Sequence, residues 1–179
     1  MRSLAELRHE NVVLQNWDFS CGAAALATIL RQAFGYPVEE RTIAEWMLRH
    51  GDPDLVTRRS GFSMLDLKSF LNSRGYEGIG YGQVALDDLT EMGSVLVPLH
   101  LNGIDHFVVF RGIAGDRVLF ADPAFGNRTL SVQAFEHAWI TRTAFVVELP
   151  WNRSGASRFT ARGESPVVPA VAAIRAALR

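Results

Sequence analysis

The sequence predicts an α+β fold in which a helical N-terminal half packs on a C-terminal antiparallel sheet. Up to about residue 74, apolar residues recur at helical spacing between capping residues and glycine stops. Beyond Gly75, short apolar runs rich in Val, Leu and Phe are separated by turn residues, which is the pattern of strands. Two of these runs are joined around Gly115-Asp116, a pair typical of hairpin turns. Helices segregated from antiparallel strands indicate the α+β class.

The N-terminal half opens with a polar lead-in and then forms three predicted helices. Val12-Val13-Leu14 is interpreted as a short edge strand. The first helix is the clearest, because its apolar residues follow 3.6-residue spacing up to Gly35. The predicted helices of this half are 21–34, 42–50 and 63–74.

Two capping signatures define the starts of the later helices. Thr42 with Glu45 three residues on, and Ser63 with Asp66, each match the capping-box spacing. The residues between these helices, 51–62, contain glycine and proline and are predicted to form a loop.

The C-terminal half is predicted to consist of short strands with two small helices. The strands are 76–82, 95–99, 106–113, 117–122, 128–131 and 143–149, and the helices are 86–92 and 132–139. Pro150 ends the sheet, so one domain is predicted over residues 1–151. Residues 152–179 are predicted to be a mobile tail of linker composition. Its end, 167–179, is compatible with a short helix, although a frayed terminus is the more frequent outcome.

Composition and charge exclude several classes of function. Basic and acidic residues number 18 and 19, giving a net charge of −1, so no electrostatic footprint for nucleic acid or anionic membrane is present. No apolar run approaches the ~20 residues of a membrane span. A single cysteine excludes an intramolecular disulfide and a multi-cysteine metal site, and no cofactor is expected. Residues 1–11 are polar and show no export signal.

The chain's one cysteine lies where a polar, turn-prone approach meets a run of small apolar residues. Asn16, Asp18 and Ser20 precede Cys21, and alanines follow it. Cys21 is therefore predicted at a helix N-terminus, where unpaired backbone N–H groups and the helix dipole stabilise a thiolate. Taken alone, a cysteine in such a run is more often an inert core residue. A nucleophile requires a histidine and a carboxylate elsewhere in the chain.

The predicted hairpin supplies those two groups. His100 and His106 flank a loop, and His106 opens a strongly apolar strand. Folding the chain about Gly115-Asp116 brings Asp122 within a few residues of being opposite His106, where cross-strand Cβ atoms are about 5 Å apart. Each residue has an ordinary explanation, since a histidine at a strand start is often a surface residue and Asp-Pro is often a turn. Their combination with Cys21 favours a Cys–His–Asp site.

Acyl-transfer chemistry assigns a role to each member of this set. The Cys21 thiolate is the nucleophile, paired with the His106 imidazolium, which protonates the leaving amine and then assists water. Asp122 fixes the imidazole tautomer. The Gln15 amide, six residues before the cysteine, binds the oxyanion with the Cys21 backbone N–H, an interaction worth about 3 kcal/mol of barrier.

These residues carry a resemblance to a known family. The motifs are Gln15, Asp18, Ser20-Cys21-Gly22-Ala23-Ala24, Gly61-Phe62-Ser63-Met64-Leu65-Asp66-Leu67-Lys68, His106-Phe107-Val108-Val109 and Ala121-Asp122-Pro123-Ala124. Over roughly residues 11–149 the chain resembles the bacteriocin-processing, double-glycine peptidases, which are papain-like cysteine peptidases. The resemblance implies a papain-like fold and the same roles for Cys21, His106, Asp122 and Gln15.

The resemblance also implies a function and a setting. It implies a stand-alone cysteine endopeptidase that cleaves after small, Gly-type residues in a secreted partner protein. Such relatives assist secretion or extracellular fibre assembly, including functional amyloid of the Fap type, and act with outer-membrane secretion components. A periplasmic location is therefore expected, with a cytoplasmic one as the alternative. Two other functions remain open: a non-cleaving adaptor or chaperone of a secretion system, and acyl transfer to an amine.

Overall fold

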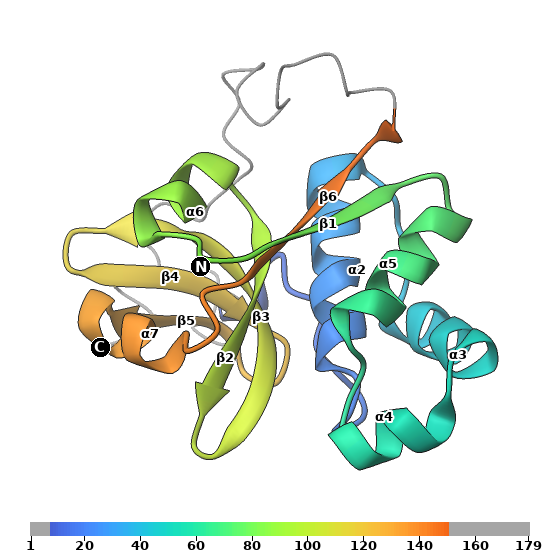
Figure 1. Cartoon of the computed structure of the whole chain (residues 1–179). Helices are drawn as coiled ribbons and strands as arrows, with labels where there is room; N and C mark the ends of the chain where they lie inside the picture. The colour runs from blue at the N-terminus through green and yellow to red at the C-terminus, as the bar shows by residue number, and fades with distance from the viewer. Residues whose placement is uncertain (1–7, 151–179) are drawn as a thin grey trace.

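The computed structural model describes residues 8–150 of the 179-residue chain, and they form a six-stranded antiparallel sheet with helices on both faces (Figure 1). The strand order is β1-β6-β2-β3-β4-β5. The strands are β1 Glu77–Tyr81, β2 Val95–Leu101, β3 Ile104–Ala114, β4 Arg117–Asp122, β5 Gly126–Ser131 and β6 Ala144–Glu148. The helices are α2 Cys21–Phe34, α3 Glu40–His50, α4 Pro53–Arg59, α5 Met64–Ser73, α6 Leu86–Met92 and α7 Val132–Ala138. The predicted α+β class is confirmed.

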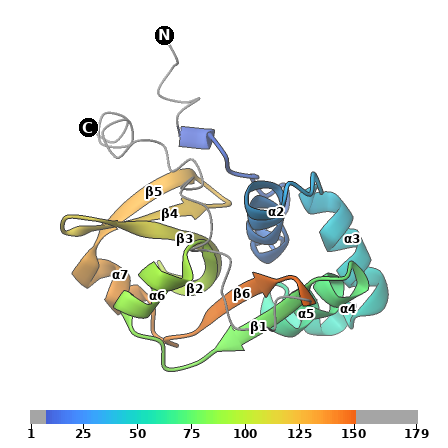
Figure 2. The ribbon, with the colours of Figure 1, turned by 90° about the horizontal axis from the view of Figure 1, so that it is seen from above.

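The sheet is buried on both faces, which explains why its central strands are almost continuously apolar. Neighbouring residues of β3 point into different cores: Val109 packs with α2, α3 and α5, whereas Val108 packs with α6 and α7. In Figure 2, α2 lies against the sheet with α3 outside it, while α6 and α7 lie on the other side of β3. The helices are therefore not confined to the N-terminal half, since α6 and α7 cover the second face.

Helix α2 is the central element of the helical layer. Residues 21–30 are buried all round, because small side chains near its start let the neighbouring elements approach closely. At Gly22 a Cβ atom would lie 3.2 Å from the ring of Phe107 on β3. The helix ends at Gly35, whose φ of 64° is the left-handed C-cap conformation.

The second predicted helix has a different start. Helix α3 begins at Glu40, with Glu39 as its N-cap and no side-chain cap, so the Thr42 capping box is wrong. The Glu45 carboxylate instead accepts hydrogen bonds from Arg41 and Arg49, four residues to either side. Glu45 thus takes part in exposed i,i+4 ion pairs and not in a capping box.

The segment 51–62 contains a helix that was not predicted. The Asp52 side chain accepts hydrogen bonds from the backbone N–H groups of Asp54 and Leu55, and Pro53 occupies the first helical position of α4. Aspartate at the N-cap with proline after it is a helix-start signal, so the sequence did contain the information. Its shortness, seven residues, hid the apolar period.

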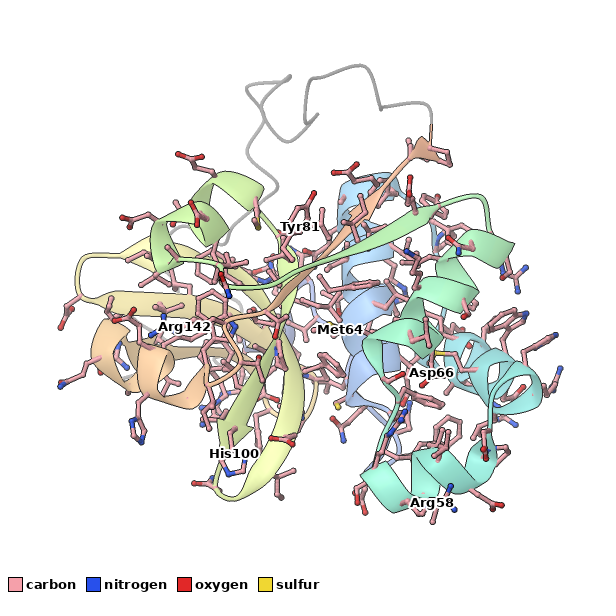
Figure 3. All side chains as sticks on the ribbon, viewed as in Figure 1. Arg58, Met64, Asp66, Tyr81, His100 and Arg142 are labelled. Carbon is pink, nitrogen blue, oxygen red and sulfur yellow. The ribbon has the colours of Figure 1, made fainter. Side chains whose placement is uncertain are left out.

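The third predicted helix start is confirmed. In the capping box of α5, Ser63 N–H donates to the Asp66 carboxylate at 2.8 Å, and Asp66 N–H donates to the Ser63 hydroxyl at 3.3 Å. Figure 3 shows Asp66 in the first turn of this helix. The predicted edge strand at 12–14 is wrong: the segment has no regular secondary structure and pairs with no strand of the sheet, and Val13 N–H donates to the Thr28 hydroxyl of α2 at 2.9 Å.

The hairpin that matters for the site forms as predicted. Ala114 pairs with Arg117, so β3 and β4 are joined by the two residues Gly115-Asp116. Strands β2 and β3 are longer than predicted, because Asn102-Gly103, both at positive φ, closes them with a two-residue turn in place of the expected five-residue loop. Strand β5 likewise begins two residues early, at Gly126.

The predicted tail, 152–179, lies outside the described residues, so the domain boundary at 151 stays a prediction. No helix within residues 8–150 combines the length and hydropathy that crossing a bilayer requires.

Candidate active site

Cys21 is the first residue of α2, as the sequence predicted. Its side chain is nearly buried, and the residue is 7% exposed. The preceding residue, Ser20, is the N-cap, and its carbonyl accepts the backbone N–H of Ala24 at 3.0 Å, the first bond of the helix. The sulfur therefore lies at the end of the helix where backbone N–H groups have no intrahelical partner.

His106 and Asp122 meet across the β3–β4 hairpin. Val109 pairs with Ala121, so Asp122 comes beside Val108, two residues from His106. Diagonal neighbours of this kind are within reach of long side chains. His106 Nε2 and Asp122 Oδ1 are 2.7 Å apart, which is the hydrogen bond the hairpin predicted.

Asp122 is held from three directions although it is fully buried. Its Oδ1 also accepts the Ala124 N–H at 2.9 Å, and its Oδ2 accepts a bond from Arg128 Nη1 at 2.8 Å. Burial is the largest single influence and acts to raise the pKa of Asp122. The hydrogen bond and charge of His106, with the bonds from Arg128 and Ala124, outweigh it and lower that pKa. The carboxylate therefore stays charged.

The pKa of His106 is raised to about 9. Burial is again the largest influence and acts to lower this pKa, but hydrogen bonds with Asp122 and Cys21 and the charges of both residues outweigh it. Since Nε2 is engaged by Asp122, Nδ1 is the ring nitrogen left to face the thiol. The helix and the sheet thus bring Cys21, His106 and Asp122 together, with His106 hydrogen-bonded to Asp122 and close to the thiol.

Gln15 is linked through its backbone to the loop that follows Asp122. Its N–H donates to the carbonyl of Pro123, the residue after Asp122, at 2.8 Å. Its side-chain Nε2 donates one hydrogen to the Trp17 carbonyl at 3.0 Å, which leaves the second N–H of the amide for another acceptor. Gln15 Oε1 is buried and has no hydrogen-bond partner.

The other histidine beside the predicted loop is not part of the set. His100 Nδ1 is 2.8 Å from Asp105 Oδ1, an exposed pair next to the β2–β3 turn. Figure 3 shows His100 on that hairpin. Within residues 8–150, no group of three or more His, Cys, Asp and Glu side chains has the arrangement of a metal site.

Two polar side chains that hold the site were not predicted. Arg128 lies on β5, where Phe120 pairs with it, so it reaches Asp122 diagonally across β4 and β5. Arg128 was the first residue of the predicted strand 128–131, and extending that strand back to Gly126 would have shown its register against Asp122. Glu40 contacts the segment between Gln15 and Cys21, and no sequence pattern relates it to that segment.

A thiol beside an imidazole that a carboxylate orients is an arrangement for nucleophilic acyl transfer. Known proteins carry the same fold and sequence pattern. Residues 9–149 match the Peptidase C39 family. The fold is shared with a crystallised double glycine motif protease from an AMS/PCAT transporter in complex with the leader peptide: the TM-score is 0.58 at 23% identity, over 77% of this chain and 90% of the other.

Two curated relatives come from pseudomonads and share one name, "Probable functional amyloid protease FapD". The Pseudomonas fluorescens protein is 45% identical, and the Pseudomonas aeruginosa protein 39%, each over 140 residues. The matched part is 78% of this chain, and the chain spans 61% of the length of either relative. The resemblance seen in the sequence motifs is confirmed by the family match across almost all of the described residues. The chain belongs to the Peptidase C39 family.

Proposed function

We propose that this protein is a cysteine peptidase in which Cys21 is the nucleophile, His106 the general acid and base, and Asp122 the residue that orients His106. One observation carries the proposal: a buried carboxylate is hydrogen-bonded to the imidazole of His106, and that imidazole lies close enough to the chain's one thiol for Cys21 to help raise its pKa. With a pKa of about 9, His106 is protonated at neutral pH and stabilises a neighbouring thiolate.

The reaction follows from these positions in two steps. The Cys21 thiolate attacks the carbonyl carbon of the scissile bond, and His106 gives its Nδ1 proton to the leaving amine as the C–N bond breaks. His106 is then neutral and takes a proton from water, whose oxygen attacks the thioester. The acid product leaves, and the thiolate and imidazolium are restored.

Gln15 is the proposed oxyanion donor. Its Nε2 keeps one N–H that Trp17 does not use, and its backbone is anchored to the residue after Asp122. A preorganised donor of this kind stabilises the developing oxyanion by about 3 kcal/mol.

We infer a substrate that presents a small, Gly-type residue before the scissile bond in a secreted or fibre-forming protein. The names of the two pseudomonad relatives support a role in functional amyloid, and the double glycine motif protease of similar fold supports the Gly preference. A periplasmic site of action beside an outer-membrane secretion component fits this role.

Cleavage of defined peptides tests the activity and the preference together. The full chain is incubated with an internally quenched peptide carrying a central Gly-Gly pair and with a matched Leu-Leu peptide. Cleavage after Gly-Gly alone, abolished in Cys21→Ala, is expected. Tight binding without cleavage by the unmodified chain would refute the peptidase and favour the adaptor, and an amide product seen by mass would favour acyl transfer.

Alkylation of the thiol tests the ion pair without a substrate. Iodoacetamide reacts with thiolate, so Cys21 should react at mildly acidic pH, where an ordinary thiol is protonated. The rate should fall at least tenfold in His106→Ala. Unchanged low-pH alkylation in that variant would refute the proposed activation by His106.

A further inference from the structure

Glu40 is a buried acid that the proposed mechanism does not use. It is the first residue of α3 and is 2% exposed, whereas the preceding residue, Glu39, is exposed. Burying a carboxylate is costly unless its oxygens accept hydrogen bonds, so its partners indicate why it is there.

All the recorded partners of this carboxylate lie in the segment before α2. Glu40 Oε1 accepts the backbone N–H of Asn16 at 2.9 Å and is hydrogen-bonded to the Ser20 hydroxyl. Glu40 Oε2 accepts a bond from Asn16 Nδ2 at 2.6 Å. Within residues 8–150, no Lys, Arg or His forms an ion pair with Glu40. The Glu40 carboxylate therefore connects the start of α3 to the segment before α2 through neutral hydrogen-bond donors.

The two residues that Glu40 contacts are sequence neighbours of two members of the proposed site. Asn16 follows Gln15, and Ser20 precedes Cys21. Cys21 is already fixed, because α2 is buried all round and the thiol contacts His106. The residues between are irregular and lack the support of a helix or strand ladder. The position of the Gln15 amide therefore depends more on the hydrogen bonds from Glu40 than the position of Cys21 does.

We propose that Glu40 is a positioning residue. By hydrogen-bonding Asn16 and Ser20 it holds the segment before α2 against the start of α3, and this fixes the position of the Gln15 amide relative to Cys21. This inference rests on the proposed function for its kinetic consequences. Its structural consequence, an ordered segment between Gln15 and Cys21, can be measured without turnover.

The test compares Glu40→Met with Glu39→Met in the full chain. Methionine keeps the length of the side chain but accepts none of the three hydrogen bonds, and Glu39 provides the same change at an exposed neighbour. For cleavage of the Gly-Gly peptide, kcat should fall 10- to 100-fold in Glu40→Met with KM changed less than threefold. A misplaced oxyanion donor affects the transition state more than the bound substrate. Glu39→Met should match the unmodified protein.

Alkylation distinguishes a displaced Gln15 amide from a damaged Cys21 thiol. Iodoacetamide displacement forms no oxyanion, so its rate at Cys21 should stay within twofold in Glu40→Met. Adding Gln15→Ala to Glu40→Met should lower kcat no further than Gln15→Ala alone, because both changes remove the same donor. Glu40→Gln should retain kcat within fivefold, since its oxygen still accepts and the Asn16 amide can turn to present its own oxygen.

Hydrogen exchange decides the matter independently of cleavage. The Asn16 N–H should exchange at least tenfold faster in Glu40→Met than in Glu39→Met. If Glu40→Met does not fold, the double variant Asn16→Ala/Ser20→Ala removes two of the three ties and should show the same loss of kcat. Unchanged Asn16 exchange, a kcat within twofold of normal, or a parallel loss of alkylation would overturn the inference. Absence of cleavage by the unmodified chain would instead refute the proposed function.

Discussion

Replacing Asp122 with asparagine tests the electrostatics of the site most directly. Asparagine keeps the shape and can still accept a hydrogen bond from His106, but it removes the negative charge and the ion pair with Arg128. Asp122 supplies the strongest of the influences that raise the pKa of His106. That pKa should fall from about 9 by at least one unit, towards its ordinary value of 6.5.

The same shift has a consequence for stability. The interval of about 2.5 units between pKa values of 6.5 and 9 corresponds to at most about 3 kcal/mol of coupling between His106 and its partners. Because the folded-state pKa is raised, this stabilisation is present in full below pH 6.5. It is lost as the pH rises from 6.5 through about 9. The free energy of unfolding should therefore fall across that interval, and it should fall less in Asp122→Asn.

NMR titration of the imidazole rings and urea unfolding at about pH 6 and about pH 9.5 measure the two quantities. Asp105→Asn is the matched control, because Asp105 is bonded in the same way to His100, an exposed histidine. It should leave the titration of His106 unchanged. The reasoning is refuted if the pKa of His106 is the same in Asp122→Asn as in the unmodified protein.

Four further changes have defined outcomes. Cys21→Ala should also lower the pKa of His106, by less than Asp122→Asn does, because it removes the weaker pair of raising influences; the same NMR titration checks this. Gly126→Ala should destabilise the fold by about 2 kcal/mol or more, since φ is 86° and a Cβ atom would lie 2.5 Å from a backbone carbonyl. Gly103→Ala, at φ 79° in open space, should cost only about 1 kcal/mol; equal losses in urea unfolding would contradict the argument. Ser63→Ala should cost about 1 kcal/mol through loss of the capping box, and a melting temperature unchanged from the unmodified protein would contradict this.

Much of the site could be predicted from local sequence patterns. The turn-prone residues before Cys21 and the alanines after it placed this cysteine at the start of a helix. The turn at Gly115-Asp116 showed which two strands pair and which ends of them meet. Counting along the hairpin brings Asp122 only near His106, because it would pair Asp122 with Val109, whose side chain points to the other face. A β-bulge between Phe110 and Gly112 shifts the register by one residue, and Asp122 then lies beside Val108 on the face of His106.

Weak or misread local signals account for the errors. The Asn102-Gly103 turn and the Asp52-Pro53 helix start were present in the sequence but were masked by a flanking loop pattern. The Thr42 capping box failed for another reason: the helix gained more from starting two residues earlier, where the Glu40 carboxylate is buried against the segment before α2.

The sequence by itself thus determined most of the elements, the hairpin that brings Asp122 near His106, and the place of Cys21 on its helix. Only the tertiary structure decided that α2 lies with its first turn against β3, so that the thiol contacts His106. Only the tertiary structure also shows that Arg128 binds Asp122 and that Glu40 binds the segment after Gln15. The physical reason is that periodicity and turn residues encode short-range geometry. Which buried acid meets which donor depends instead on how separate elements pack, and no local pattern records it.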